Sequence, residues 1–131
     1  IFLKQFLHDE DITVHGNGKQ TRTFIYVDDA VDAIMKLAFC KKAENEVFNI
    51  GNSKECSMYE LALIMKRVGG FKSKIKLVEH KRVYGESYED IPRRIPDTTK
   101  INKYIKWKSK VPLEAGIKKT IDFYRLKNEK G

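Results

Sequence analysis

Apolar positions along this chain recur with two different periods, which predict helices in some segments and strands in others. Residues three or four apart share one face of a helix, and residues two apart share one face of a strand. The helical period predicts the end of a helix over residues 1–11 and further helices over 27–39, 57–70, 98–104 and from Pro112 onward. Short β-rich runs predict strands over residues 12–15, 21–27, 47–50 and 74–78. Residues 82–96 have no clear period and predict a long loop.

This order of elements indicates an α/β or α+β arrangement with too few strands for a full doubly wound sheet. The helix over residues 57–70 has the clearest ends, because Ser57 and Glu60 stand at capping-box spacing and a Gly-Gly pair ends it. In the helix over residues 27–39, Asp28 or Asp29 is expected to cap the first turn. The face of that helix expected to be buried comprises Val31, Ile34, Met35 and Ala38.

The stretch TVHGNGKQTR contains two glycines that suit either a phosphate-binding loop or a tight turn. A dinucleotide-binding fingerprint follows a buried strand and opens directly into a helix, so that the helix N-terminus meets the pyrophosphate. Here Gly16-Asn17-Gly18 separates two runs with strand character. Asn-Gly in that setting is typical of a hairpin turn, because glycine takes positive φ at no steric cost. We therefore expect residues 12–15 and 21–27 to pair as a hairpin.

The composition is that of one domain with a basic surface. The chain has 131 residues, 41% of them hydrophobic, and a formal net charge of +8. We expect no membrane-spanning or secretory segment, because no apolar run approaches the about 20 residues that cross a bilayer. Cys40 and Cys56 lack a second Cys or His at metal-ligand spacing, which favours reduced thiols in a cytoplasmic protein. Because the chain begins at Ile1, within the expected end of a helix, we expect it to be a piece of a longer one.

The sequence contains no recognisable group of catalytic residues, and its histidines are scattered along the chain. No Ser/His/Asp or Cys/His spacing is present, and His8, His15 and His80 lie far apart. A lone histidine is more often structural or exposed than catalytic. The sequence therefore predicts no catalytic site and no metal site in this chain.

Arginine is the more informative residue type. A guanidinium is a planar, permanently charged fork that can make two parallel hydrogen bonds to a phosphate. Arg22 follows the glycine turn within a predicted strand, and Arg93 and Arg94 lie in the long loop between two prolines. From charge and spacing alone, surface ion pairs are the simpler interpretation of these three arginines.

Five segments, taken together, carry a family resemblance. They are TVHGNGKQTRTFIYVDDAVDAI, EVFNIGN, SMYELALIMKRVGG, EDIPRRIPDTTKI and YIKWKSKVPLEAGIKKTIDFYR. In order and spacing they resemble the carboxyl-terminal portion of the extended short-chain dehydrogenase/reductase family, the NAD-dependent nucleotide-sugar epimerases, dehydratases and decarboxylases. The resemblance covers the chain from about Phe2 to Arg125. It implies an α/β fold in which residues 1–131 are the substrate-binding domain of an NAD(P)-binding Rossmann-like enzyme, without the dinucleotide-binding core.

The resemblance also implies a nucleotide-sugar site that begins near the glycine turn. Thr13 and His15 match the strand whose backbone meets the nucleotide base, although the family more often has Tyr or Phe where His15 stands. Arg22 matches the arginine that binds the diphosphate, and Gln20 lies beside it at the edge of the ligand.

The second part of the implied site lies in and after the long loop. Arg94, in RRIPD, matches the second phosphate-binding arginine. Asp97, in the same motif, would reach the ribose or hold an arginine in place. Tyr84 and Arg93 are implied on the loop that covers the nucleotide. With the resemblance added, a phosphate role becomes the favoured interpretation of Arg22 and Arg94.

The portion of the family that this chain resembles does not include the NAD-binding and catalytic motifs. The family's glycine fingerprint for NAD, its Tyr-x-x-x-Lys pair and the accompanying Ser/Thr all belong upstream of Ile1. The chain would therefore hold the UDP or dTDP moiety of a sugar nucleotide for oxidation at the sugar C4 by NAD bound to an amino-terminal half. That half and a second copy in a homodimer are the implied protein partners. We expect apolar surface, with EVFNIG near or within a shared sheet, to pack on that half, so the isolated chain should be marginally stable or self-associate.

Two other functions remain open from the sequence. Thr98 to Lys110 interleaves Tyr104 and Trp107 with five lysines and no acid, a pattern that suits binding of single-stranded nucleic acid. The resemblance instead gives the tryptophan a structural packing role. A non-catalytic interaction domain that kept the fold is the other alternative. Within the family, YGESYEDIPRRIPD is most similar to the epimerase and dehydratase branch, and the sugar and base are left open.

Overall fold

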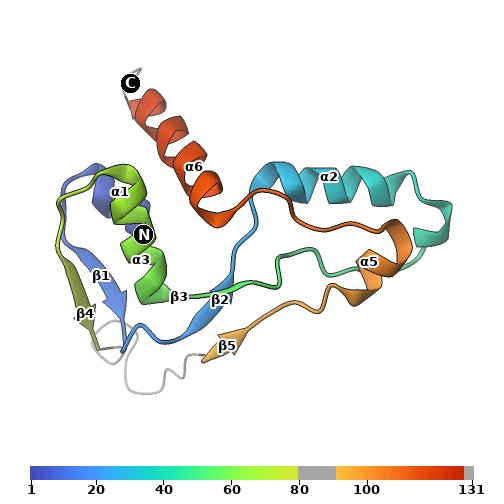
Figure 1. Cartoon of the computed structure of the whole chain (residues 1–131), viewed down its shortest axis with the longest axis horizontal. Helices are drawn as coiled ribbons and strands as arrows, with labels where there is room; N and C mark the ends of the chain where they lie inside the picture. Colours follow the sequence, from blue (N-terminus) through green and yellow to red (C-terminus); the bar gives the residue numbers. More distant parts are fainter. Residues whose placement is uncertain (80–90, 129–131) are drawn as a thin grey trace.

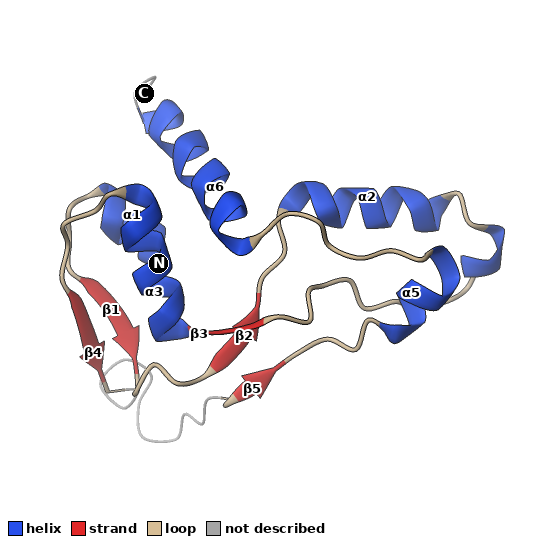
Figure 2. Cartoon of the chain, viewed as in Figure 1, coloured by secondary structure: helices blue, strands red, loops and turns tan. Residues whose placement is uncertain are grey.

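The computed structural model describes residues 1–79 and 91–128, which form two helical lobes with a small sheet between them (Figures 1 and 2). One lobe contains α1 (Phe2–Leu7), β1 (Ile12–His15), α3 (Met58–Gly69), β4 (Ile75–Val78) and α6 (Leu113–Asn128). The other contains α2 (Val27–Ala38), the 3-10 helix η1 (Lys41–Ala43) and α5 (Thr99–Ile105). The sheet between the lobes contains β2 (Thr21–Thr23), β3 (Glu55–Ser57) and β5 (Arg93–Arg94).

The two strands around the glycine turn belong to different sheets, so the predicted hairpin is wrong. β1 pairs with β4 in parallel, whereas β2 lies between β3, which is antiparallel to it, and β5, which is parallel. The turn itself is confirmed, since Gly16 has φ 68° and Gly18 has φ 69°. A side chain on Gly18 would come within 2.9 Å of Tyr59 Cβ. The chain therefore uses this turn to pass closely over α3 from one sheet to the other.

Helix α3 begins and ends as the sequence predicts. Ser57 and Glu60 form a reciprocal capping box, and Gly70 ends the helix in the left-handed region with φ 67°. The backbone N–H groups of Met58 and Tyr59 donate to the carbonyls of Gln20 and Gly18, both at 3.1 Å. The first turn of α3 is thus satisfied by the chain itself.

The first lobe is held together by a core beneath the β1–β4 pair. Its fully buried members are Phe6, Ile12, Val14 and Ala62, and partly buried side chains from α1, α3 and β4 pack against them. Phe6 stacks on Phe71 with ring centroids 4.6 Å apart. The predicted strands over residues 12–15 and 74–78 are confirmed and are neighbours in this sheet. They are far apart in the chain, so only the tertiary structure shows that they pair.

The second lobe buries the face of α2 opposite to the predicted one. Ala33 packs with Ile101 and Trp107, whereas Ile34 is 55% exposed and Met35 is 51% exposed. The helix is amphipathic, and the apolar side that the period predicts as buried is exposed among the described residues, so the period does not show which element covers it. The predicted aspartate cap is also wrong, because Tyr26 occupies the N-cap and makes no side-chain capping bond.

Residues 47–50 form no strand in the part of the chain that the structure describes, which corrects that prediction. Phe48 and Ile50 pack in the second core, and Val47 is 83% exposed. Alternate side chains are partly buried, as in a strand, but no described segment forms backbone hydrogen bonds of a sheet with these residues. The predicted helices that became α1, α5 and α6 are confirmed. Among residues 1–79 and 91–128, no helix combines the length and apolar character needed to span a membrane.

Candidate functional site

Two predicted site residues, Arg22 and Arg94, are brought together by the parallel pairing of β2 with β5. They are Cα register partners, so their side chains leave the sheet on the same face. Adjacent strands lie about 4.8 Å apart, so the two side chains start from neighbouring positions on that face. The strand β5 is only two residues long and was not predicted within the loop.

The guanidinium of Arg22 is held in place by backbone carbonyls. Its Nη1 donates to the carbonyl oxygens of Thr21 and Ile91, both at 2.8 Å. The Ile91 contact joins Arg22 to the segment that leads into β5. Arg94 is exposed, and no ion pair to it occurs among residues 1–79 and 91–128. One half-buried arginine and one exposed arginine therefore share this face.

Arg93 points to the opposite face, where a carboxylate binds it. Its Nη2 lies 2.8 Å from Glu55 Oε1, and its Nε lies 3.2 Å from both Glu55 oxygens. Thr21 Oγ1 donates to the same carboxylate at 2.8 Å. The hydrogen bonds from Arg93, and then that from Thr21, hold the pKa of Glu55 below its usual value. The positive charge of Arg93 is therefore already paired with a carboxylate.

Thr13, His15 and Gln20 lie along β1 and the turn that follows it. Gln5 of α1 donates to Thr13 Oγ1 at 2.9 Å and accepts from the Thr13 backbone N–H at 3.3 Å. Gln20 Nε2 donates to the His15 carbonyl at 2.9 Å. The structure thus joins His15 to Gln20, which immediately precedes β2, while Thr13 is bound to α1. Their predicted contacts with a nucleotide remain a prediction.

Asp97 lies two residues before α5, just ahead of its N-cap residue Thr98, and Tyr84 lies outside the described residues. Asp97 Oδ1 accepts from the Thr99 N–H at 2.8 Å, and the hydrogen bonds from Thr99 lower the pKa of the Asp97 carboxyl group. The Asp97 carbonyl accepts from Asn49 Nδ2 at 3.3 Å. These contacts orient the chain after β5. Within residues 1–79 and 91–128, no ion pair joins Asp97 to an arginine.

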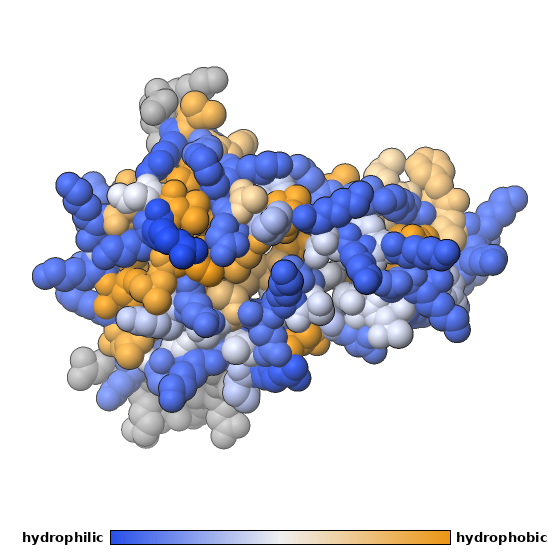
Figure 3. Space-filling view, in the orientation of Figure 1, coloured by the Kyte–Doolittle hydropathy of each residue, from blue (hydrophilic) through white to orange (hydrophobic). Residues whose placement is uncertain are grey.

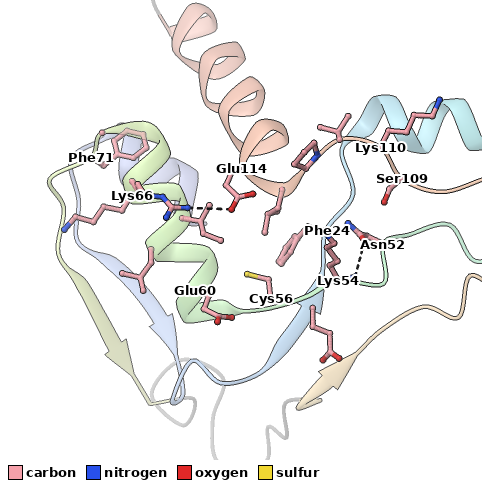
Figure 4. Close-up of a pocket in the computed structure, with 18 residues that line it drawn as sticks. Phe24, Asn52, Lys54, Cys56, Glu60, Lys66, Phe71, Ser109, Lys110 and Glu114 are labelled. Atoms are coloured by element: carbon pink, nitrogen blue, oxygen red, sulfur yellow. Dashed lines mark hydrogen bonds and ion pairs between the residues drawn. The ribbon is translucent and has the colours of Figure 1, made fainter.

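A hollow of about 1170 Å³ lies between α3, β3 and the start of α6, and Glu55 is among the residues that line it. Figure 4 shows Phe24, Cys56 and Glu114 facing this space. Arg67 and Glu114 form a 3.7 Å ion pair at its edge. Burial, followed by the nearby carboxylates of Glu60 and Glu114, raises the pKa of the Cys56 thiol. None of the predicted site residues lines the hollow. The cationic side chains that line the hollow are mixed with carboxylates, which weakens it as a candidate anion site.

The glycine turn does not fit a dinucleotide cofactor. The residues after Gly18 enter the strand β2 rather than a helix. The α3 N-terminus, which packs on this turn, already has its first N–H groups bonded to Gly18 and Gln20. We therefore assign no NAD contact to these residues.

The two aromatic residues of the segment Thr98 to Lys110 pack within the second lobe. Trp107 is 3% exposed, and its Nε1 donates to Asp32 at 3.0 Å. Tyr104 packs edge-on against Phe48 and donates to Glu46 at 3.3 Å. Trp107 therefore cannot stack on a base without unfolding this lobe, which removes the main support for a nucleic-acid module. Its structural role matches the one implied by the family resemblance.

Comparison with known proteins identifies relatives along nearly the whole chain. Residues 2–120 match the GDP-mannose 4,6 dehydratase family. A UDP-N-acetyl-alpha-D-glucosaminuronate decarboxylase of Bacillus cytotoxicus is 39% identical over 124 residues, which are 95% of this chain and 38% of that protein. The chain thus spans about two fifths of that relative's length and corresponds to the carboxyl-terminal portion of such enzymes.

Solved structures agree on the fold. UDP-glucose 4-epimerase of Thermotoga maritima, solved with UDP-glucose, has a TM-score of 0.81 and 30% identity, over 97% of this chain and 38% of that one. UDP-glucuronic acid 4-epimerase of Bacillus cereus, solved in complex with NAD, has a TM-score of 0.78, over 95% of this chain and 38% of that one. At 23% identity, the second likeness shows the fold alone. One similar protein is a decarboxylase and two are epimerases, so the predicted epimerase and dehydratase branch stays a prediction.

Proposed function

This chain belongs to the GDP-mannose 4,6-dehydratase family of NAD-dependent nucleotide-sugar epimerases, dehydratases and decarboxylases, and on that premise we propose that it binds the nucleotide diphosphate of a UDP-sugar. The observation that supports the proposal is the register of β2 and β5, which sets Arg22 beside Arg94 on one face. Uridine is the proposed base because the similar decarboxylase and the similar epimerase are both named for UDP-sugars.

Two adjacent guanidinium groups suit a diphosphate for a simple physical reason. Each offers paired N–H donors whose spacing matches two phosphate oxygens, and charge-assisted hydrogen bonds contribute about 1.5–3 kcal/mol each. Arg22 is already oriented by the Thr21 and Ile91 carbonyls, so little side-chain freedom is lost when an anion arrives. Arg94 is exposed and can close over the second phosphate.

The proposed site positions the substrate and takes no part in making or breaking bonds. Binding energy taken up on the nucleotide, remote from the reacting carbon, orients the sugar for chemistry elsewhere. NAD, when bound by the rest of such an enzyme, supplies the hydride acceptor. In this chain, Arg22 and Arg94 would hold the diphosphate, and Gln20 with His15 would border the base.

The exposed face of α2 is the proposed contact with the dinucleotide-binding half. Val27, Val31, Ile34 and Met35 are each more than half exposed and lie on one side of that helix. Figure 3 shows hydrophobic surface near the far end of α2, within an otherwise hydrophilic region. Contiguous apolar surface of this kind commonly marks an interface. Residues 47–50 form no strand among the described residues, and we propose that they add a strand to the sheet of that half.

The test is a calorimetric titration of the protein, as its gene encodes it, with UDP, dTDP, UDP-glucose and a short oligonucleotide. Arg22→Ala and Arg94→Ala should each weaken UDP binding by about 1.5 kcal/mol or more, roughly tenfold. A preference for UDP over dTDP would establish the base.

Arg67→Ala is the matched control, because Arg67 is an exposed arginine on α3, outside the set of predicted site residues. It should leave UDP affinity unchanged. Absence of UDP binding by the folded protein, or a loss of affinity with Arg67→Ala alone, would refute the proposed site. Salt-sensitive binding of the oligonucleotide in place of UDP would favour the nucleic-acid alternative.

A further inference from the structure

A carboxylate on β3 reaches across β2 to the strand that carries Arg94. Glu55 accepts from Arg93 Nη2 at 2.8 Å and from Arg93 Nε at 3.2 Å, and it also accepts from Thr21 Oγ1 at 2.8 Å. The sheet order is β3-β2-β5, so the Glu55–Arg93 pair spans all three strands. A single side chain thereby connects the two outer strands of this sheet through the middle one.

The connection matters because β5 is short and its register decides which arginine lies beside Arg22. It consists of Arg93 and Arg94, and the Thr21 N–H donates to the Pro92 carbonyl at 2.9 Å just before it. Side chains alternate between the two faces of a strand, so a slip of one residue would exchange the faces of these two arginines. With Arg93 bound to Glu55 on one face, Arg94 must lie on the other, beside Arg22.

We propose that Glu55 is a positioning residue of the diphosphate site, which holds Arg93 so that Arg94 stays paired with Arg22. This inference rests on the proposed nucleotide-binding function. It assigns opposite roles to two neighbouring arginines: Arg93 anchors the strand, and Arg94 meets the ligand. It also predicts that a residue on the far face of the sheet, without contact to the ligand, controls affinity for it.

The first experiment needs no ligand. Amide hydrogen exchange of the Thr21 N–H reports the β2–β5 pairing, because that group donates to Pro92. Glu55→Ala should accelerate its exchange by about tenfold or more, and Glu55→Gln, which keeps one acceptor oxygen, should have an intermediate effect. The matched control is Glu46→Ala, which breaks an ion pair of similar exposure with Lys100 in the other lobe and should leave Thr21 unchanged. Unchanged exchange in Glu55→Ala would overturn the inference.

The second experiment is a double-mutant cycle on UDP affinity. Glu55→Ala and Arg93→Ala should each weaken binding by about threefold to tenfold, and the double variant should be no weaker than the more affected single variant. Adding Arg94→Ala to the double variant should weaken UDP binding further, because that arginine is proposed to contact the ligand directly. In a turnover assay of the full-length product, Glu55→Ala should raise KM more than it lowers kcat.

The outcomes separate the two claims. UDP binding that depends on Arg22 and Arg94 but not on Glu55 would overturn the positioning role and leave the proposed function intact. Faster Thr21 exchange in Glu55→Ala, in a protein that does not bind UDP at all, would overturn the proposed function and show that the Glu55 contact is only structural. Additive losses in Glu55→Ala/Arg93→Ala would show that the two side chains act separately and would also contradict the inference.

Discussion

Arg22 on β2 and Arg94 on β5 are register partners in a parallel pair of strands, although most of the chain runs between them. Neither residue is close to the other in sequence, and β5 lies in a loop without periodicity. The long connection passes through α2, β3, α3 and β4 before it returns. The proposed diphosphate site is therefore a product of the fold and not of one local motif.

The fork geometry of Arg94 should matter as well as its charge. Arg94→Lys retains the positive charge but loses the planar pair of donors, so UDP affinity should fall by about threefold, less than in Arg94→Ala. The melting temperature should not change, because Arg94 is exposed. Titration calorimetry and a thermal melt on the same samples measure both quantities. Equal affinities for Arg94→Lys and the wild type would show that only charge is recognised.

Asp29 should be among the most sensitive positions for stability. It is buried, and its Oδ2 accepts from the backbone N–H groups of Lys110 and Val111, both at 2.9 Å. Asp29→Ala leaves two part-buried backbone donors without this acceptor and should lower the unfolding free energy by about 2–4 kcal/mol. Asp29→Asn keeps one acceptor oxygen and should lower the unfolding free energy by less. Urea denaturation measures both; a loss below about 1 kcal/mol in Asp29→Ala would contradict this account.

Trp107 should contribute to stability and not to nucleic-acid binding. Its indole is buried and donates to Asp32, so Trp107→Ala should cost about 3–5 kcal/mol of unfolding free energy. Trp107→Phe should cost less and remain folded. Fluorescence anisotropy with a labelled oligonucleotide should give the same weak, salt-dependent affinity for the wild type and Trp107→Phe. A marked loss of oligonucleotide affinity in folded Trp107→Phe would instead indicate that Trp107 stacks on a nucleic-acid base.

The exposed face of α2 should make the isolated chain self-associate. Ile34 is 55% exposed, and Val31 beside it is 51% exposed. Ile34→Lys should shift sedimentation towards the monomer without lowering the melting temperature, because the side chain has no core partner to lose. Ile101→Lys, which introduces the same charge at a position that is 0% exposed, should instead unfold the second lobe. A wild-type chain that sediments as a monomer would falsify the prediction.

The two thiols should differ in reactivity. Burial is the main cause that raises the pKa of Cys56, and the carboxylates of Glu60 and Glu114 add to it. Less thiolate is therefore present at any pH below that raised value, and access is restricted, whereas Cys40 is partly exposed. Alkylation followed by mass mapping should modify Cys40 first at neutral pH, with Cys56 reacting only at higher pH or on unfolding. Faster modification of Cys56 in the native protein would contradict its burial.

The sequence by itself determined the features that depend on neighbours one helical turn away. The capping box between Ser57 and Glu60 and the end of α3 at Gly70 are correct because hydrogen bonds within a few residues create them. The glycine turn is correct for the same reason. Local chemistry also placed Arg22 in a strand next to that turn. Family resemblance then connected Arg22 with Arg94.

Only the tertiary structure decided which elements meet. The strands on either side of the glycine turn joined different sheets, because β4 and β5, far along the chain, offered better partners than the adjacent hairpin. The period of α2 separates an apolar side from a polar one, but it could not show that the described chain buries Ala33 and leaves Ile34 and Met35 exposed. Glu55 had no local signal at all, since its partner Arg93 lies 38 residues away. Pairing between distant segments depends on the global packing of the chain, and no local pattern in the sequence records it.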